Sequence, residues 1–469
     1  MKYSPPLSPG LKSLSGDALA NAVSAEVDAA MAGPAPHPGE VVGLVFAISL
    51  AQGDPRASLR TGGIAIISRQ IRQLHALGVA RVVLVQGEGQ AGALDLARRE
   101  AARAGIGLAI AESAAELSAS LAGCAALAID EALLVDERML EAFWGETALH
   151  TAPRPVLALR DAANGLTAGL AIFPAGTLTP AACAGLFAKG LAALSVPAAQ
   201  PHDLSALDDY APARRRRLPM VWLPLHSAAD GRKGTSVLLE SAQKGCLDWP
   251  ARFIHPPVEN LLTRLLLPTP ITPNMISVFV FLLGLYAAWC FASGAWPLAL
   301  ALVLVIGPLD GLDGKLARTR LDFSPYGDLE HVGDKIVEYA CYICMAAWLD
   351  DGWAWASCAL IVLFALAEAV QGEFYRRLTG GQLDDAGTIE RGFRLVSGRR
   401  NTFMWTLIPF VVLGAWEAGF VMIAAYSVVT FFFMQWRFFI RLGQTVRKAS
   451  PVMAENLRRT AYAFLKKGK

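Results

Sequence analysis

A run of 21 residues from Met275 to Ala295 contains no charged side chain. As a helix, a run of this length spans the hydrocarbon core of a bilayer. Further apolar segments follow at about residues 296–319, 329–349, 352–373, 402–416 and 418–436. Charged residues make up 17% of the chain, below the roughly 25% of soluble proteins. The sequence therefore predicts six membrane-spanning helices in the C-terminal half.

The distribution of Lys and Arg predicts how these helices are oriented. Arginines are frequent between the fourth and fifth predicted spans, both Lys and Arg are frequent after the sixth, and neither occurs in the short connections near Gly294, Asp350 and Glu417. Basic residues flank membrane spans on the cytoplasmic side. We therefore expect an inner-membrane protein with both termini, and the loop between the second and third spans, in the cytoplasm. A net charge of +2 argues against nucleic acid as a partner.

The N-terminal half has a different pattern. Buried strands are predicted at Val42–Ile48 and Ala80–Val85, and between them apolar residues recur at helical spacing up to Gly78. A strand, a helix and a second strand at this spacing form a parallel unit. Further strands are predicted at residues 125–129, 156–159 and 170–173. The predicted fold is an α/β three-layer, Rossmann-like domain followed by an all-α membrane domain.

Composition divides the chain into five segments. We expect a disordered tail at 1–40, the α/β domain at 41–215, a linker with an interfacial amphipathic helix at 216–270, the six-span domain at 271–446 and a basic cytoplasmic tail at 447–469. The run Arg214–Arg217 has two interpretations that the sequence leaves open. It is either a solvated charge run or a contact with anionic lipid head groups.

Ionisable residues cluster between residues 310 and 335, where they are costly inside predicted spans and therefore point to function. Asp310 and Asp313 are three residues apart, and Glu330 and Asp334 are four apart, so each pair shares one face of its helix. Carboxylates brought together at low dielectric repel one another unless a cation lies among them. Because the ligands are all oxygens, the expected ion is Mg²⁺ or Mn²⁺, which suits phosphoryl transfer.

The residues after Asp313 suit a phosphate-containing substrate. Gly314 and Ala317 leave room for a bulky ligand against the helix. Arg318 can bind a phosphate through two parallel hydrogen bonds.

The whole motif resembles a family signature. Its pattern is Asp310-x2-Asp313-Gly314-x2-Ala317-Arg318-x8-Gly327. It is similar to the signature D-x2-D-G-x2-A-R-x8-G-x3-D-x3-D of the CDP-alcohol phosphotransferases, also called CDP-alcohol phosphatidyltransferases. The resemblance covers about residues 248–446 and implies six spans, with the motif on the second and third. It also implies transfer from a CDP-alcohol to an acceptor hydroxyl, with release of CMP.

The second half of the signature departs from the family pattern. Strict spacing would place its last two aspartates at His331 and Lys335, whereas carboxylates stand one position earlier, at Glu330 and Asp334. We interpret this as a loop shortened by one residue, for which the longer Glu side chain compensates. The resemblance then implies that Glu330 and Asp334 join the two motif aspartates as metal ligands. It implies that Asp334 is also the general base that deprotonates the acceptor hydroxyl.

A group of arginines near the fifth predicted span has two interpretations. They are Arg391, Arg394, Arg399 and Arg400. They either bind a phosphate on the acceptor alcohol, as the resemblance implies for relatives that use phosphorylated inositol or glycerol, or only satisfy the positive-inside rule. Glu368, in the fourth predicted span, either pairs with Arg376 or Arg377 or touches the substrate.

The first domain resembles the sugar-phosphate nucleotidyltransferases. The predicted helix Ser68–Gly78 and strand Ala80–Val85 match that family's pattern, and Asp130 falls where its metal-binding aspartate would lie. Residues 49–63 lack the closely spaced glycines and the Pro-Lys of the family's phosphate loop. We therefore expect a degenerate, catalytically inactive nucleotidyltransferase-like domain. The fusion is similar to that of the bifunctional inositol-phosphate cytidylyltransferase/di-myo-inositol phosphate phosphate synthases.

These sequence features leave three candidate functions for the chain. The first is a metal-dependent membrane CDP-alcohol phosphotransferase of phospholipid biosynthesis, with CDP-diacylglycerol as favoured donor, a polar alcohol or lipid as acceptor, and a homodimeric state in the lipid bilayer implied by the resemblance. The second is a bifunctional cytidylyltransferase and phosphotransferase with a di-inositol-phosphate-like product. The third is a non-catalytic membrane scaffold. CTP binding by residues 41–215 separates the second function from the first, and metal-dependent CMP release separates the first from the third.

Overall fold

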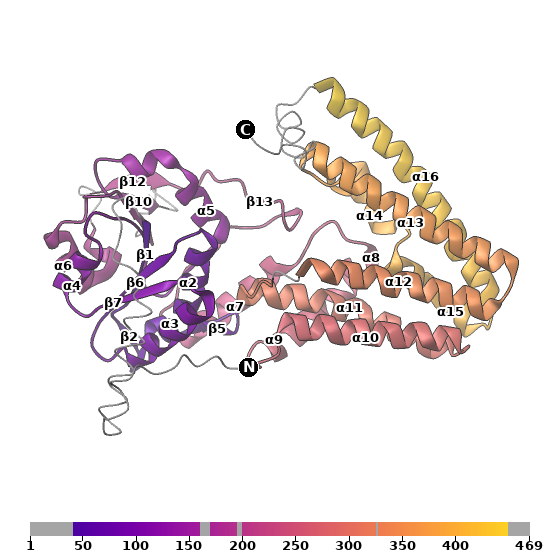
Figure 1. The fold of residues 1–469 in the computed structure, drawn as a ribbon, viewed down its shortest axis with the longest axis horizontal. Helices are drawn as coiled ribbons and strands as arrows, with labels where there is room; N and C mark the ends of the chain where they lie inside the picture. Colours follow the sequence, from indigo (N-terminus) through magenta and orange to yellow (C-terminus); the bar gives the residue numbers. More distant parts are fainter. Residues whose placement is uncertain (1–40, 160–168, 195–198, 325–326, 449–469) are drawn as a thin grey trace, which may run out of the picture. The chain divides into compact units, whose positions relative to one another are not determined.

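The computed structural model describes residues 41–159, 169–194, 199–324 and 327–448. The predicted tail at 1–40 and most of the predicted tail at 447–469 lie outside these residues. The chain divides into two compact units (Figure 1). The first comprises the described residues up to Asp209 together with Leu218–Glu240, and the second comprises Tyr210–Arg217 and the described residues from Ser241 onward.

A seven-stranded sheet forms the centre of the first unit (Figure 1). Its strands, in spatial order, are β12 (Gln200–Asp203), β10 (Val156–Leu159), β11 (Leu170–Phe173), β8 (Ala125–Ile129), β1 (Val41–Ala47), β6 (Arg81–Gln86) and β7 (Gly107–Ala111). β1 is parallel to both β6 and β8, and β11 is antiparallel to its two neighbours. The predicted strands and the parallel unit around β1 are confirmed.

Helices cover both faces of this sheet. Successive residues of β1 point to opposite faces: Val45 belongs to one apolar cluster, and Leu44 and Phe46 belong to the other. The first cluster is completed by α2 (Ile66–Ala76), α3 (Ala91–Ala104) and α5 (Glu137–Gly145), and the second by α4 (Ala114–Ser120) and α6 (Pro180–Lys189). The predicted α/β class is therefore confirmed, with three layers in the order helix, sheet, helix.

Short elements complete the first unit and the connection to the second. They are β2 (Leu50–Ala51), β3 (Asp54–Pro55), β4 (Arg60–Thr61), β5 (Ile64–Ala65), β9 (Leu133–Val135), β13 (Tyr210–Ala211), β14 (Arg216–Arg217), β15 (Trp222–Pro224) and α7 (Ala228–Ala242), with 3₁₀ turns at Arg56–Ser58, Thr147–Thr151 and Gly190–Ala193. β13 and β14 form a small hairpin that belongs to the second unit.

The second unit consists of helices. They are α8 (Trp249–Phe253), α9 (His255–Leu266), α10 (Pro273–Ala292), α11 (Trp296–Arg320), α12 (Gly327–Leu349), α13 (Gly352–Thr379), α14 (Thr388–Val396), α15 (Arg400–Val412) and α16 (Trp416–Lys448), with a 3₁₀ turn, η6, at Leu383–Asp385. Within the described residues, α10, α11, α13 and α16 are long and apolar enough to cross a membrane. α12 and α15 coincide with the two other predicted spans, but α12 begins with charged residues and α15 has only 13 residues. Four of the predicted spans thus correspond to helices that could cross a membrane by length and composition, and the number six stays a prediction.

Close packing of α10 against α12 depends on one glycine. A Cβ atom on Gly284 would lie 2.5 Å from a methyl carbon of Val337. Val337 is 5% exposed and β-branched, so it has little freedom to move away. Gly284 therefore sets the separation of two helices that also carry Ser277 and Asp334.

The short helix α9 buries its polar side. His255, Glu259 and Thr263 are spaced by four residues and are buried, whereas Leu261 and Leu265 are each 60% exposed. The buried side packs on α11, where a Cβ on Gly311 would lie 2.7 Å from a carboxylate oxygen of Glu259.

Substitution of Gly284 by Ala tests the α10–α12 contact. The added methyl group overpacks the interface, and we expect a loss of about 1–3 kcal/mol in stability. Thermal unfolding of the detergent-solubilised protein, followed by tryptophan fluorescence, measures the loss. Gly443→Ala is the matched control, because Gly443 lies in α16 with no atom near a built Cβ and Ala is the better helix former. Equal melting temperatures for the two variants would contradict the close contact.

Candidate active site

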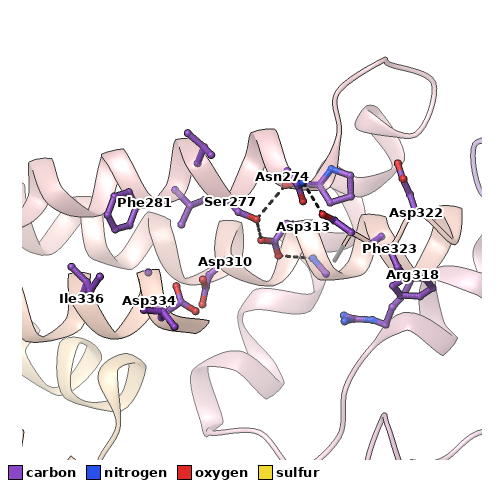
Figure 2. Close-up of a pocket in the computed structure, with 18 residues that line it drawn as sticks. Asn274, Ser277, Phe281, Asp310, Asp313, Arg318, Asp322, Phe323, Asp334 and Ile336 are labelled. Atoms are coloured by element: carbon purple, nitrogen blue, oxygen red, sulfur yellow. Dashed lines mark hydrogen bonds between the residues drawn. The ribbon is translucent and has the colours of Figure 1, made fainter. Parts of the chain in front are cut away.

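Two aspartates of α11 lie beside α10 and α12 (Figure 2). Asp310 and Asp313 are one turn apart and share a side of α11. Asp313 is 3% exposed and accepts a hydrogen bond of 2.5 Å from the Ser277 hydroxyl on α10. The backbone N–H of Gly314 also donates to Asp313. The Asp313 carboxylate is therefore oriented by two donors from different helices.

Asp334 on α12 lies against Asp310 (Figure 2). Their side chains are within hydrogen-bonding reach of each other. Asp334 lines the cavity beside α10 and α11, whereas His331 and Lys335 do not line it. Lys335 instead pairs with Glu338 at 2.7 Å. Of the two residues that compete for the last motif position, Asp334 rather than Lys335 therefore lies against Asp310.

Glu330, the other residue selected by the shift, lies in the first turn of α12, and its side chain is outside the described part of the structure. Its role as a metal ligand stays a prediction. Among the side chains that the structure describes, no three acidic, His or Cys groups are arranged to enclose a metal ion. The chemistry of the aspartates nevertheless fits a hard divalent cation, because carboxylate oxygens are the ligands that Mg²⁺ and Mn²⁺ prefer.

Arg400, at the start of α15, compensates the charge of the facing aspartates. Its guanidinium pairs with Asp310, and a second terminal nitrogen lies 3.5 Å from Asp334. Two carboxylates this close repel each other in a poorly hydrated site, and a fixed cation offsets that repulsion. Arg400 therefore forms ion pairs with both aspartates. Neither interpretation of the arginine group, acceptor binding or the positive-inside rule, anticipates this role.

An apolar cavity of about 580 Å³ lies beside the aspartates (Figure 2). Apolar side chains of α10 and α12 form much of its wall, and the predicted substrate-binding residues Gly314, Ala317 and Arg318 line it as well. A Cβ on Gly314 would lie 2.9 Å from a terminal nitrogen of Arg318, so the glycine lets the guanidinium rest against α11. The Nε atom of Arg318 donates to the carbonyl of Ala242 at 3.0 Å.

A second cavity of about 580 Å³ shares Asp310 and Asp334 with the first. Most of the residues that line it are polar or charged. They include His331, Lys335, Glu338, Glu368, Arg399, Arg400 and Asn401. The paired aspartates therefore stand between an apolar cavity and a polar one.

Two of the predicted acceptor-binding arginines form ion pairs with neighbouring aspartates. Arg391 pairs with Asp385, and Arg394, which is 8% exposed, pairs with Asp384 at 3.1 Å. Arg399 differs, because it lines the polar cavity, 44% of its side chain is exposed and it lies 3.9 Å from Asp384. Of the four arginines, Arg399 is therefore the best placed to meet a ligand in the polar cavity.

Asp384 is the centre of an ion-pair network around this cavity. Arg215, from the hairpin β13–β14, donates to both of its carboxylate oxygens at 2.9 Å. Burial alone would raise the pKa of Asp384, but Arg215, Arg399 and Arg394 outweigh burial and lower the pKa. Within the run Arg214–Arg217, Arg215 is therefore committed to an internal ion pair.

The predicted pairing of Glu368 with Arg376 or Arg377 is wrong. Both arginines pair with Glu373, at 2.9 and 2.7 Å, because Glu373 lies one turn before them on α13. Glu368 instead lines the polar cavity.

One buried ion pair beside the site has no counterpart in the sequence analysis. Lys315 lies inside the motif, is 1% exposed, and contacts Glu259 of α9 at 3.1 Å and Gln243 at 2.6 Å. Burial raises the pKa of Glu259, and the ammonium group of Lys315 opposes that shift. The pair anchors α9 to the motif helix. The spacing of four residues between His255, Glu259 and Thr263 is the signal from which this buried polar face could have been inferred.

Comparison with known proteins finds a family match within the C-terminal half. Residues 270–432 match the model of the CDP-alcohol phosphatidyltransferase family. The chain is also similar to proteins named "Bifunctional IPC transferase and DIPP synthase". That of Aquifex aeolicus is 26% identical over 236 residues, which are 48% of this chain and 54% of the relative. That of Rubrobacter xylanophilus is 35% identical over 23% of this chain and 24% of the relative, and that of Thermococcus kodakarensis is 25% identical over 41% and 44%. The chain thus spans about half the length of the relatives it matches, or less.

The ion pairs of α14 predict a specific sensitivity to acid. Glu390 is fully buried and bonds to Arg437 and Arg441 of α16 at 2.6 and 2.7 Å. Burial opposes ionisation, but these two arginines lower the pKa of Glu390 from 4.5 to about 2. A carboxylate with a depressed pKa in the folded state stabilises the fold above its unfolded pKa and loses that contribution as the pH falls through the folded value.

We therefore expect Glu390→Gln to lower stability at pH 7 by about 3–5 kcal/mol. The difference from the wild type should shrink as the pH falls from 4.5 toward about 2, since protonation then removes the same charge. Melting temperatures in detergent across this range measure it, with the exposed Glu417→Gln as control. A difference that stays constant with pH would contradict the assigned ion pairs.

Proposed function

We propose, from the CDP-alcohol phosphatidyltransferase domain at residues 270–432, that the chain is an integral membrane CDP-alcohol phosphotransferase. It transfers the phosphoalcohol or phosphatidyl group of a CDP-alcohol to an acceptor hydroxyl and releases CMP. The observation that carries this proposal is the position of Asp310 and Asp334, which line both cavities. A donor with acyl chains suits the apolar cavity and a water-soluble acceptor suits the polar one, so the reacting groups meet at the aspartates.

The roles of the residues follow from the two cavities. In the apolar cavity, Gly314 and Ala317 leave space for the donor, and Arg318 binds its diphosphate. Asp334 accepts the proton of the acceptor hydroxyl. The acceptor oxygen then bonds to the phosphorus that carries the alcohol, and CMP leaves with the electrons of the broken bond. Arg399 supplies a positive charge for an acceptor that carries a phosphate.

The metal ligands in this proposal are Asp310, Asp313, Glu330 and Asp334. A divalent cation, Mg²⁺ or Mn²⁺, would polarise the phosphates and offset their charge. Arg400 holds Asp310 and Asp334 near each other, which keeps two of these ligands together on separate helices.

The membrane setting is part of the proposal. We assign six spans by adding α12 and α15 to the four apolar helices, with both termini and the site on the cytoplasmic side. The exposed apolar side of α9 suits a helix at the membrane surface. A homodimer and a place in phospholipid biosynthesis, with CDP-diacylglycerol as donor, complete this proposal.

The names of the relatives favour a second candidate. Because they are described as bifunctional IPC transferases and DIPP synthases, the product of this chain is alternatively di-inositol-phosphate-like. The two candidates share the chemistry at Asp334 and differ in the donor, CDP-diacylglycerol or CDP-inositol.

The proposal is tested by CMP release from the purified protein in nanodiscs. CDP-diacylglycerol and CDP-inositol are each offered with Mg²⁺ or Mn²⁺ and with a panel of polar alcohols and their phosphates. We expect release that requires the metal ion and an acceptor. Loss of the general base costs about 10²–10⁴-fold in rate, so Asp334→Asn should lower release by at least that factor. The exposed Asp351→Asn, between α12 and α13, is the matched control and should leave the rate unchanged. If folded protein released no CMP from any donor, the proposal would be overturned in favour of a non-catalytic scaffold.

Substitution of Arg400 tests how the aspartates are neutralised. Arg400→Gln leaves Asp310 and Asp334 without their shared cation, and breaking such a pair costs about 3–5 kcal/mol. In EDTA, we expect Arg400→Gln to melt at a lower temperature than the wild type. When Mg²⁺ or Mn²⁺ is added, the melting temperature of the variant should rise by more than that of the wild type. Arg376→Gln, which removes an exposed pair with Glu373, is the control. If Arg400→Gln and the wild type gained equally from the metal ion, the assignment of these aspartates as ligands would be wrong.

A further inference from the structure

The order of strands in the first unit predicts where a ligand would bind. From β1 the chain runs to β6 and β7 on one side, and then crosses to β8 on the other side of β1. In open parallel sheets, ligands bind beyond the carboxyl ends of the strands at such a reversal. Here that position lies between the segment that follows β1, which begins at Ile48, and the segment that follows β8, which contains Glu131.

The carboxylate of Glu131 occupies this position. Its Oε1 atom accepts hydrogen bonds from the backbone N–H groups of Ile48 and Ser49, at 2.8 and 2.9 Å. Its other oxygen accepts a hydrogen bond from the Ser49 hydroxyl and lies 4.0 Å from a guanidinium nitrogen of Arg56. Glu131 is 5% exposed. Proteins bind phosphate with donors of this kind: consecutive N–H groups, a hydroxyl and an arginine. Here the carboxylate of Glu131 already occupies these donors.

The surrounding segments close the same position. The guanidinium of Arg56 also donates to the carbonyl of Leu225 at 3.0 and 3.2 Å, so it is held in place by the fold. Gly190 comes so near that a Cβ there would lie 3.3 Å from the Ile48 side chain and 3.4 Å from a carboxylate oxygen of Asp130. The segment after β1 folds back on itself, and the N–H of Arg56 bonds to the carbonyl of Ser49 at 3.0 Å. A triphosphate would have to displace several mutually bonded groups.

We propose that Glu131 is an internal occupant of the anion position in the first unit, so that this unit does not take up a nucleoside triphosphate. The donor is then made by a separate nucleotidyl-transfer reaction, in which a phosphate oxygen of a phosphorylated alcohol bonds to the α-phosphorus of CTP and pyrophosphate leaves. The separate origin of the donor rests on the proposed function of the C-terminal domain, whereas the role of Glu131 does not.

Photolabelling of the full-length chain tests the role of Glu131 directly. The wild type in nanodiscs is irradiated with labelled azido-CTP and Mg²⁺, and the labelled peptides are mapped. We expect no label in residues 41–240 of the wild type. Glu131→Ala frees the loop donors and should gain label in the peptide that contains Ile48 and Ser49, whereas the exposed Glu141→Ala should not. Glu131→Gln, which keeps the shape and removes the charge, replaces Glu131→Ala if that variant does not fold.

The outcomes separate this inference from the proposed function. CTP-dependent label at residues 41–240 of the wild type, or pyrophosphate release from CTP and a phosphorylated alcohol, would overturn the inference even if CMP release from a supplied CDP-alcohol is normal. A folded Glu131 variant that stays as unlabelled as the wild type would also overturn it. Loss of CMP release from supplied CDP-alcohol, with no label in the first unit, would refute the proposed function and leave the role of Glu131 standing.

Discussion

The second unit depends on the neutralisation of aspartates that face each other across α11 and α12. Asp310 and Asp334 are close enough to repel, and Arg400 from α15 compensates both of them. This contact links three helices whose remaining surfaces are mostly apolar, so it fixes the relative position of helices that could otherwise slide. It also explains why charged residues occur in helices of this apolar character, where an uncompensated charge would be costly.

The same aspartates divide the interior into two chemical environments. Aliphatic and aromatic side chains of α10 and α12 line much of one cavity, and arginines, lysine and glutamates line much of the other. A transfer between a lipid-soluble and a water-soluble substrate needs such a division, because each substrate must be solvated differently while the reacting atoms meet. The ion pairs around Asp384 support the polar side, since Arg215 and Arg394 hold this carboxylate in place.

The sequence predicts periodic and local features well, and it fails where partners are chosen by tertiary packing. The strands around β1 and the end of α2 before Gly78 follow from apolar patterns and a glycine with φ of 83°, both of which are local. The spacing of Asp310 and Asp313 likewise places them on one face. By contrast, Arg400 is one of several neighbouring arginines, and nothing in its local sequence shows that it pairs with Asp310. Glu259 and Lys315 are 56 residues apart, so no helical periodicity reveals their contact.

The two units use carboxylates in opposite ways, and the difference lies in how completely the hydrogen-bonding capacity of each carboxylate is satisfied. In the first unit, Glu131 receives two backbone N–H groups and a hydroxyl, so its oxygens have little left to offer a ligand. In the second, Asp310 and Asp334 are compensated by a guanidinium and also line two cavities, which leaves them accessible to a substrate or a cation. A saturated carboxylate stabilises a loop, whereas a charge-paired carboxylate at a cavity can exchange its partner. This physical difference favours the second unit as the place of the chemistry.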